Sequence, residues 1–199
     1  MTTPTPIRPY NRLAKGIARA FLDLTGWEPE GFRPAESKFV LIAAPHTTNW
    51  DLAYLLAFAV LFDVRITWMG KHVLFRQPLG WIMRALGGMP VVRSRRGDLV
   101  GQLVNEFESR ESLALVVPAE GTRSYTPFWK SGFYHIARGA DVPIVMGYLD
   151  YARKRGGFGS ALFPTGDIRA DMDEIRDFYE DIVGKYPESF GRPQLKEES

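Results

Sequence analysis

The 199-residue sequence contains no cysteine and only three histidines. Without cysteine the chain can form no disulfide bond, no thiolate metal site and no cysteine nucleophile. The three histidines, His46, His72 and His135, are scattered, and no two have the spacing of metal ligands on one helix, so we expect no metal site. A Gly-x-Ser-x-Gly motif is also missing, which argues against a serine hydrolase.

Long apolar runs are missing as well. The longest extends from Leu52 to Phe62, far short of the roughly 20 residues that a membrane-spanning helix needs. The first residues show no apolar core of a signal peptide. We therefore expect a cytoplasmic protein, either free or peripheral on the inner face of the membrane.

The composition is that of one globular domain, with 45% apolar and 24% charged residues. A chain of this length is too short for two ordinary domains. Three prolines fall within residues 1–9, which we expect to form a flexible leader. The domain itself is expected at residues 10–190, with a polar tail at residues 191–199.

The formal net charge is only +2, but basic residues are concentrated in one acid-free stretch before Asp98. Such a stretch favours an anionic ligand or surface, although a solvated basic face explains it equally well. These residues form no known nucleic-acid-binding module, so we expect no nucleic-acid partner. The stretch contains Arg65, Lys71, Arg76, Arg84, Arg93, Arg95 and Arg96.

Segments with the apolar pattern of buried strands alternate with segments of helical periodicity. This alternation predicts an α/β fold, a single domain with a mixed, largely parallel central sheet flanked by helices. Strands are predicted at 39–44, 65–69, 113–117 and 143–151, a turn or hairpin at 154–159, and helices at 10–25, after residue 51, and at 74–86, 98–110, 131–139 and 171–186.

The helix predicted at residues 10–25 is amphipathic. Its apolar residues recur at steps of three and four, and basic residues occupy a separate face. Such a helix can pack its stripe on the domain or lie in a membrane interface, and both alternatives stay open. The stripe consists of Tyr10, Leu13, Ala14, Ile17, Phe21 and Leu24, and the basic face of Arg12, Lys15 and Arg19.

The segment Pro45-His-Thr-Thr-Asn-Trp-Asp51 follows the first predicted buried strand. A tight turn at this junction can fold the carboxylate of Asp51 back to a ring nitrogen of His46. A carboxylate on one nitrogen fixes the tautomer and raises the basicity of the other, which makes a general base. Alternatively, Asp51 merely caps the next helix and His46 is a turn residue.

A second polar loop, Pro118-Ala-Glu-Gly-Thr-Arg-Ser124, follows another buried strand. Gly121 allows a close approach of the backbone to a ligand, and Arg123 offers a planar fork that suits phosphate, with hydroxyl donors on either side at Thr122 and Ser124. Glu120 can accept a hydrogen bond from an acceptor hydroxyl beside the phosphate. The alternative is an ordinary polar turn.

Together, the His-x4-Asp element and the later Glu-Gly-Thr-Arg-Ser segment resemble the glycerolipid acyltransferase family, which includes lysophosphatidic acid and glycerol-3-phosphate acyltransferases. Residues 70–93 are similar to the second sequence block of that family, and Val142-Pro-Ile-Val145 to its fourth. The resemblance covers roughly residues 38–150.

The resemblance implies a role for each matching residue. His46 would be the general base and Asp51 its orienting partner. Lys71 and Arg123 would hold a phosphate of the acceptor, with Arg93 as a further candidate, and Glu120, Gly121 and Thr122 would shape the acceptor site. The family uses neither a metal nor an acyl-enzyme: the acceptor hydroxyl attacks the thioester directly, and a backbone N–H would stabilise the oxyanion.

The substrates stay open at this point. Ala119 stands between Pro118 and Glu120, where the family has proline directly before glutamate, so the acceptor loop departs from the usual pattern. The acceptor can be a lysophospholipid or a glycolipid, aminolipid or hydroxylated metabolite, and the donor acyl-CoA or acyl carrier protein. A non-catalytic lipid- or anion-binding module is a third alternative, which the His46–Asp51 pair disfavours because binding an anion needs no base.

Overall fold

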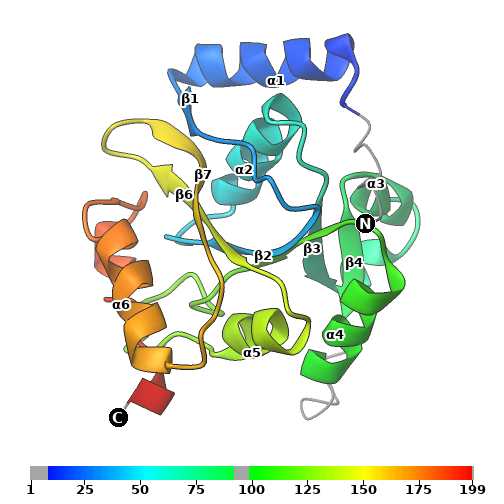
Figure 1. Cartoon of the computed structure of the whole chain (residues 1–199). Helices are drawn as coiled ribbons and strands as arrows, with labels where there is room; N and C mark the ends of the chain where they lie inside the picture. The colour runs from blue at the N-terminus through cyan, green and yellow to red at the C-terminus, as the bar shows by residue number, and fades with distance from the viewer. Residues whose placement is uncertain (1–8, 92–98, 199) are drawn as a thin grey trace.

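A computed structural model of the chain describes residues 9–91 and 99–198. Seven strands form one sheet in the order β1-β7-β6-β2-β5-β3-β4, and all neighbouring strands are parallel except β6 and β7 (Figure 1). The predicted mixed, largely parallel sheet is confirmed. The strands are β1 (Glu28–Gly31), β2 (Lys38–Ala43), β3 (Ile66–Lys71), β4 (Gly88–Val91), β5 (Leu113–Val117), β6 (Ile144–Asp150) and β7 (Arg155–Leu162).

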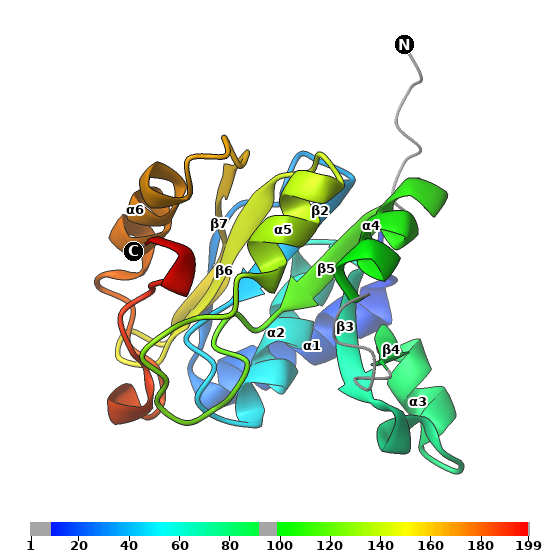
Figure 2. The same cartoon turned by 90° about the horizontal axis from the view of Figure 1, so that it is seen from below.

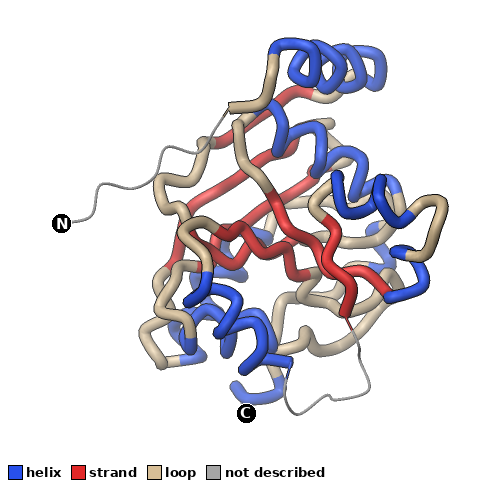
Figure 3. Tube along the Cα trace, turned by 90° about the vertical axis from the view of Figure 1, so that its right-hand side faces the viewer, coloured by secondary structure: helices blue, strands red, loops and turns tan. Residues whose placement is uncertain are grey.

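Helices cover both faces of this sheet (Figures 1 and 3). One face packs on α2 (Trp50–Leu61), which α1 (Arg12–Thr25) crosses on its outer side. The opposite face packs on α4 (Leu99–Ser109), α5 (Gly132–Gly139) and α6 (Ile168–Tyr179). The short helices are α3 (Gly80–Ala85), η1 (His72–Phe75), η2 (Pro187–Ser189) and η3 (Lys196–Glu198).

The centre of the sheet is apolar on both faces. Along β2, Phe39 and Leu41 pack toward α2, whereas Val40 and Ile42 pack toward α4, α5 and α6. All four side chains are buried, which is typical of a parallel strand covered on both sides. This explains why β2 is a continuous apolar run in the sequence.

The topology brings the two polar loops to one edge of the sheet. Because β2, β3, β5 and β6 run parallel, their carboxyl ends lie at the same edge, where α/β proteins bind ligands. The segment 44–49 follows β2, and the segment 118–131 follows β5. These strands are adjacent in the sheet, so the two loops leave it side by side.

Three predicted elements were wrong in part. The helix expected at 74–86 is broken into η1 and α3, because Pro78 has no N–H to donate and disfavours a helical residue before it. The helix expected at 171–186 runs from Ile168 to Tyr179, after Asp167 caps its N-terminus. The turn or hairpin predicted at 154–159 exists, but its turn lies at 151–154, between the antiparallel strands β6 and β7, and residues 155–159 already belong to β7.

Three of the six residues of the predicted apolar stripe are exposed on helix α1. Leu13, Ile17 and Leu24 are 73%, 63% and 88% exposed, whereas the helix buries Ala18 and Leu22. The face of α1 that packs on the domain is therefore rotated about the helix axis relative to the predicted apolar stripe. None of the described helices is both long and apolar enough to cross a bilayer.

The segment expected as a polar tail lies against the domain over residues 191–198. Leu195 is fully buried, and the carbonyl of Gln194 accepts a hydrogen bond of 2.8 Å from the backbone N–H of Trp129. Arg176 of α6 donates to the carboxylate of Glu198 at 2.6 Å. Of the predicted leader, residues 1–8 lie outside the described residues.

Candidate active site

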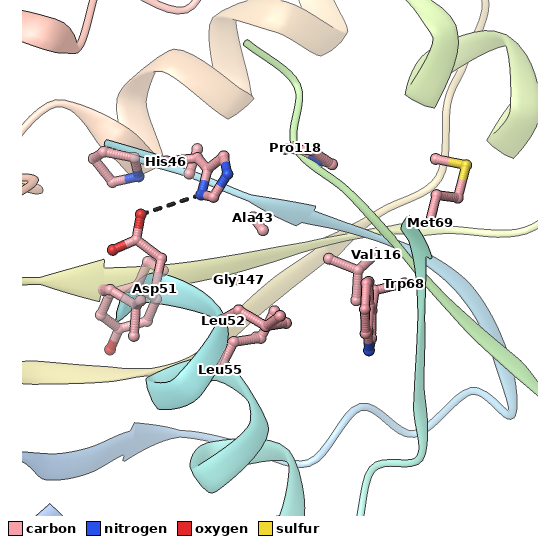
Figure 4. A pocket seen from close by; sticks show the side chains of 14 residues that line it. Ala43, His46, Asp51, Leu52, Leu55, Trp68, Met69, Val116, Pro118 and Gly147 are labelled. Atoms are coloured by element: carbon pink, nitrogen blue, oxygen red, sulfur yellow. Dashed lines mark hydrogen bonds and ion pairs between the residues drawn. The ribbon is translucent and has the colours of Figure 1, made fainter. Parts of the chain in front are cut away.

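His46 and Asp51 lie together at the junction between β2 and α2. The turn that follows β2 places the imidazole over the first turn of α2, and the distance from Nδ1 of His46 to Oδ2 of Asp51 is 3.1 Å (Figure 4). A carboxylate in this position favours the tautomer with the proton on Nδ1. The lone pair of Nε2 is then free to accept a proton.

Asp51 is held by four hydrogen-bond donors. Besides the ring of His46, Oδ2 accepts from the backbone N–H groups of Thr47 and Thr48 at 2.9 and 3.0 Å. The hydroxyl of Tyr151 donates to Oδ1 at 2.7 Å. The side chain of Asp51 is only 7% exposed, and a buried carboxyl group needs such hydrogen-bond partners. The arrangement fixes the orientation of Asp51.

Tyr151 is a site residue that the sequence analysis missed. It directly follows β6 and lies 100 residues from Asp51, so no local pattern connects the two. Burial and the hydrogen bond to Asp51 raise the pKa of Tyr151 well above its usual value, so the hydroxyl remains a donor. Its ring packs against Trp27 and Tyr54. The only sequence signal was its place at the carboxyl end of a buried strand.

Glu120 connects the second loop to His46. Its two carboxylate oxygens accept from the backbone N–H of His46 at 3.0 and 3.2 Å, and the residue is 2% exposed. Burial raises the pKa of Glu120 to about 7, although the hydrogen bond from His46 opposes this shift. The carboxylate thus holds the loop that carries the imidazole.

The rest of this loop faces solvent. Gly121 has a left-handed backbone with φ of +69°, and its N–H donates to the carbonyl of Pro118 at 3.0 Å. Thr122 and Arg123 are exposed, so their hydroxyl and guanidinium groups are available to a ligand at this edge. Lys130, which the sequence analysis did not single out, lies beside Gly121.

An apolar cavity of about 140 Å³ opens beside His46, between α2 and the sheet. Figure 4 shows His46 and Asp51 at one end and Trp68 with Met69 at the other. The indole N–H of Trp68 donates to the carbonyl of Leu86 at 2.8 Å, which fixes that end. The lining residues are Ala43, Ala44, Pro45, His46, Asp51, Leu52, Leu55, Trp68, Met69, Val116, Pro118, Gly147, Tyr148 and Leu149.

The chain matches the Acyltransferase family over residues 29–147, which is more than half of its length. It belongs to this family. The structure is similar to the crystal structure of the 1-acyl-sn-glycerophosphate (LPA) acyltransferase PlsC from Thermotoga maritima, with a TM-score of 0.55 and 18% sequence identity over 85% of this chain and 75% of that chain. At this identity the likeness shows a common fold. No curated protein matches the sequence.

The predicted site residues of this acyltransferase differ in how deeply they are buried. His46 contacts both Asp51 and Glu120, whereas Gly121, Thr122 and Arg123 lie on the exposed part of the adjoining loop. Lys71 is the last residue of β3, so its backbone reaches the same edge, and Arg93 lies outside the described residues. The part of the chain that the structure describes contains no group of three or more metal-ligating side chains.

Proposed function

We propose that this acyltransferase moves a fatty acyl group from a thioester, acyl-CoA or acyl carrier protein, to a hydroxyl of a lysophospholipid-like acceptor. The observation that carries this proposal is the position of His46, held by Asp51, at the mouth of an apolar cavity. A base and an apolar chain site are the two features that transfer of a fatty acyl group to a hydroxyl requires.

The proposed reaction is one direct displacement at the thioester carbonyl. Nε2 of His46 takes the proton of the acceptor hydroxyl while its oxygen attacks the carbonyl carbon. As the new C–O bond is completed, the C–S bond breaks and the thiolate receives the proton from the imidazolium. Asp51 stabilises the imidazolium between these steps, so no acyl-enzyme is needed.

The cavity is suited to the first part of the acyl chain. A cavity of similar size in another protein stays dry and binds benzene, so about 140 Å³ admits a segment of roughly six carbons. Leu52, Leu55 and Val116 offer this segment an apolar wall. With the chain held there, the thioester carbonyl would lie beside His46, where the acceptor oxygen must meet it.

The acceptor would be held at the exposed loop. If it carries a phosphate, Arg123→Ala should weaken acceptor binding by about 1.5–3 kcal/mol, the usual worth of a hydrogen bond to a charged group. The KM of the donor should barely change. Steady-state kinetics with both substrates varied would check this, with Arg138→Ala, an exposed arginine of α5, as the matched control.

An unchanged acceptor KM in Arg123→Ala, for every acceptor that reacts, would contradict a phosphate at this loop. The second alternative, the same chemistry on a glycolipid, aminolipid or hydroxylated metabolite, would then be favoured.

The decisive experiment concerns His46. We expect His46→Ala to lower acyl transfer by at least about 10², the lower range of what a general base contributes, while circular dichroism shows an unchanged fold. The product would be identified by mass spectrometry after incubation with labelled acyl donors and lipid extracts. His135→Ala is the matched control, since this exposed histidine lies on α5. A folded His46→Ala protein with near-normal turnover would contradict the mechanism.

A further inference from the structure

The segment from His72 to Leu86, which we call the finger, projects from the edge that carries the active site. It follows the carboxyl end of β3 and consists of η1, a turn at Pro78 and α3. Figure 2 shows α3 and the adjoining turn beyond the end of β3, at the periphery of the molecule. The finger therefore extends outward next to the loops that carry His46 and Arg123.

The finger exposes five large apolar side chains. Val73, Leu74, Leu79, Trp81 and Leu86 are 65%, 47%, 59%, 63% and 41% exposed. Exposed leucine or valine residues are common singly, but four of these five fall within nine residues and form a patch. Such an exposed apolar patch indicates a surface that contacts another protein or a membrane.

The segment that carries these exposed side chains is itself well packed. Phe75, in the middle of the finger, is only 5% exposed and packs against Trp68. A methyl group at Gly80 would lie 2.0 Å from the carbonyl oxygen of Phe75, so η1 and α3 are in close contact. The carbonyl of Leu86 accepts the indole N–H of Trp68. The finger is thus anchored at its middle and at its end.

The charge of the finger is of one sign. Residues 64–97 contain no aspartate or glutamate, and Arg76 and Arg84 are exposed among the apolar side chains. The guanidinium of Arg84 lies 5.6 Å from the ring of Phe75 and donates to the carbonyls of Gly80 and Phe75 at 3.3 and 3.5 Å, so this cation is held on the finger. Interleaved tryptophan, leucine and arginine are the composition of segments that enter the interface of an anionic membrane.

A further aromatic residue lies at the same edge. Trp50, the first residue of α2, is 55% exposed beside the loop of His46. Tryptophan is favoured at the level of lipid headgroups because its ring is apolar and its N–H is polar. We propose that the finger inserts into the interface of an anionic lipid bilayer and so holds the active-site edge against the lipid surface.

The proposal deepens the proposed function, since it assigns the surface through which a lipid acceptor would be reached. Lipid binding can nevertheless be measured without an acyl donor. The purified full chain would be sedimented with vesicles of equal parts phosphatidylcholine and phosphatidylglycerol at low and high salt. The variants are Leu79→Ala with Trp81→Ala, and separately Arg76→Gln. The matched control is Phe163→Ala, because Phe163 is 56% exposed after β7, at the opposite edge of the sheet.

We expect the affinity of the double variant for vesicles to fall by at least about tenfold, because two large apolar side chains are no longer transferred from water into the bilayer. Arg76→Gln should lose binding at low salt and resemble the unmodified protein at high salt. The control should bind normally. Circular dichroism would check that each variant is folded, and Arg76→Gln keeps the test decisive if the double variant is not.

Two results would overturn the proposal. The first is an unmodified protein that does not bind vesicles, and the second is normal vesicle binding by folded variants of the finger. If such a variant also lost turnover with an acyl carrier protein donor and not with acyl-CoA, the finger would instead dock a protein. Vesicle binding by a protein that transfers no acyl group would refute the proposed function and leave this inference intact.

Discussion

Asp51 receives hydrogen bonds from the ring of His46 and the hydroxyl of Tyr151 on its two different oxygens. Oδ2 therefore faces the imidazole of His46, while Oδ1 is held by the hydroxyl of Tyr151. A carboxylate that cannot rotate presents its charge to the imidazole in one direction only. Tyr151 would accordingly be a positioning residue, which acts on the reaction through Asp51 and not on the substrate.

We expect Tyr151→Phe to lower kcat by about tenfold with little change in KM. The hydroxyl of Tyr151 fixes the rotation of the Asp51 carboxylate. Without it the carboxylate can turn, and the imidazole is held in its reactive orientation for a smaller part of the time, which lowers the rate of the chemical step more than substrate binding. Steady-state kinetics would measure kcat and KM separately.

Tyr54→Phe is the matched control for this variant. Its ring lies 6.0 Å from that of Tyr151 in the same aromatic cluster, but Asp51 receives its hydrogen bond from Tyr151. If both variants changed kcat equally, or if Tyr151→Phe changed only KM, the hydroxyl of Tyr151 would not act through Asp51.

The two contacts of His46 differ in how far the sequence could predict them. His46 and Asp51 are five residues apart between a strand and a helix, so local geometry alone can bring them together. Glu120 lies 74 residues from His46, and its hydrogen bond depends on β2 and β5 being neighbours. A sequence pattern marks Glu120 as polar and loop-borne but does not contain the strand order that decides its partner.

At the level of elements, the central strands were predictable and the edge strands were not. Strands β2, β5 and β6 are apolar because both of their faces are covered. The edge strands β1, with sequence Glu-Pro-Glu-Gly, and β4, with Gly-Met-Pro-Val, have no apolar alternation. They form because β7 and β3 each present a free edge with which they can pair. Their formation therefore depends on neighbouring strands and not on a pattern in their own sequence.

Helix α1 has both a packed face and an exposed apolar face. Leu22 is fully buried, Phe21 packs on Tyr54 of α2, and Lys15 pairs with Asp63 at 2.5 Å. Deleting the helix would therefore uncover the core, and loss of vesicle binding in a deletion variant would not identify its cause. Leu13 and Ile17 can be changed without touching that face, because they are 73% and 63% exposed.

We expect Leu13→Ser with Ile17→Ser to keep the unfolding midpoint in urea while lowering sedimentation with anionic vesicles. The physical reason is that only the exposed stripe is altered, whereas the contacts of Ala18 and Leu22 are retained. The matched control is Ala18→Ser, which changes the buried face. It should lower the unfolding midpoint instead. Unchanged vesicle binding by the folded double variant would show that α1 is not a membrane contact.

At the scale of the whole molecule, one buried ionisable group at the active-site edge of the sheet, Glu120, makes the stability of the fold depend on pH. Glu120 lies in the loop directly after β5 and is 2% exposed. Burial disfavours its charged form, whereas the backbone N–H of His46 favours it. The balance raises the pKa of Glu120 from 4.5 to about 7, so folding is coupled to the protonation of this one carboxyl group.

The direction of the coupling follows from the two pKa values. Below pH 4.5 both the folded and the unfolded chain hold the proton, and the stabilisation is fully present. As the pH rises toward 7, the unfolded chain releases the proton first, so the free energy of unfolding falls. Above that value both states are ionised and the contribution is lost. A shift of this size corresponds to roughly 3 kcal/mol over the whole range.

We therefore expect the free energy of unfolding of the unmodified protein, relative to that of Glu120→Gln, to decline between about pH 4.5 and 7.5 and then to level off. Glutamine does not titrate, and its amide oxygen can still accept from His46, so the difference between the two proteins isolates this one group. Urea unfolding across that pH range would measure it. Glu174→Gln, at an exposed position on α6, is the matched control. A constant difference for Glu120→Gln would mean that the buried carboxylate ionises as readily in the folded protein as in the unfolded chain, and that the charge beside His46 is present at every pH at which the enzyme works.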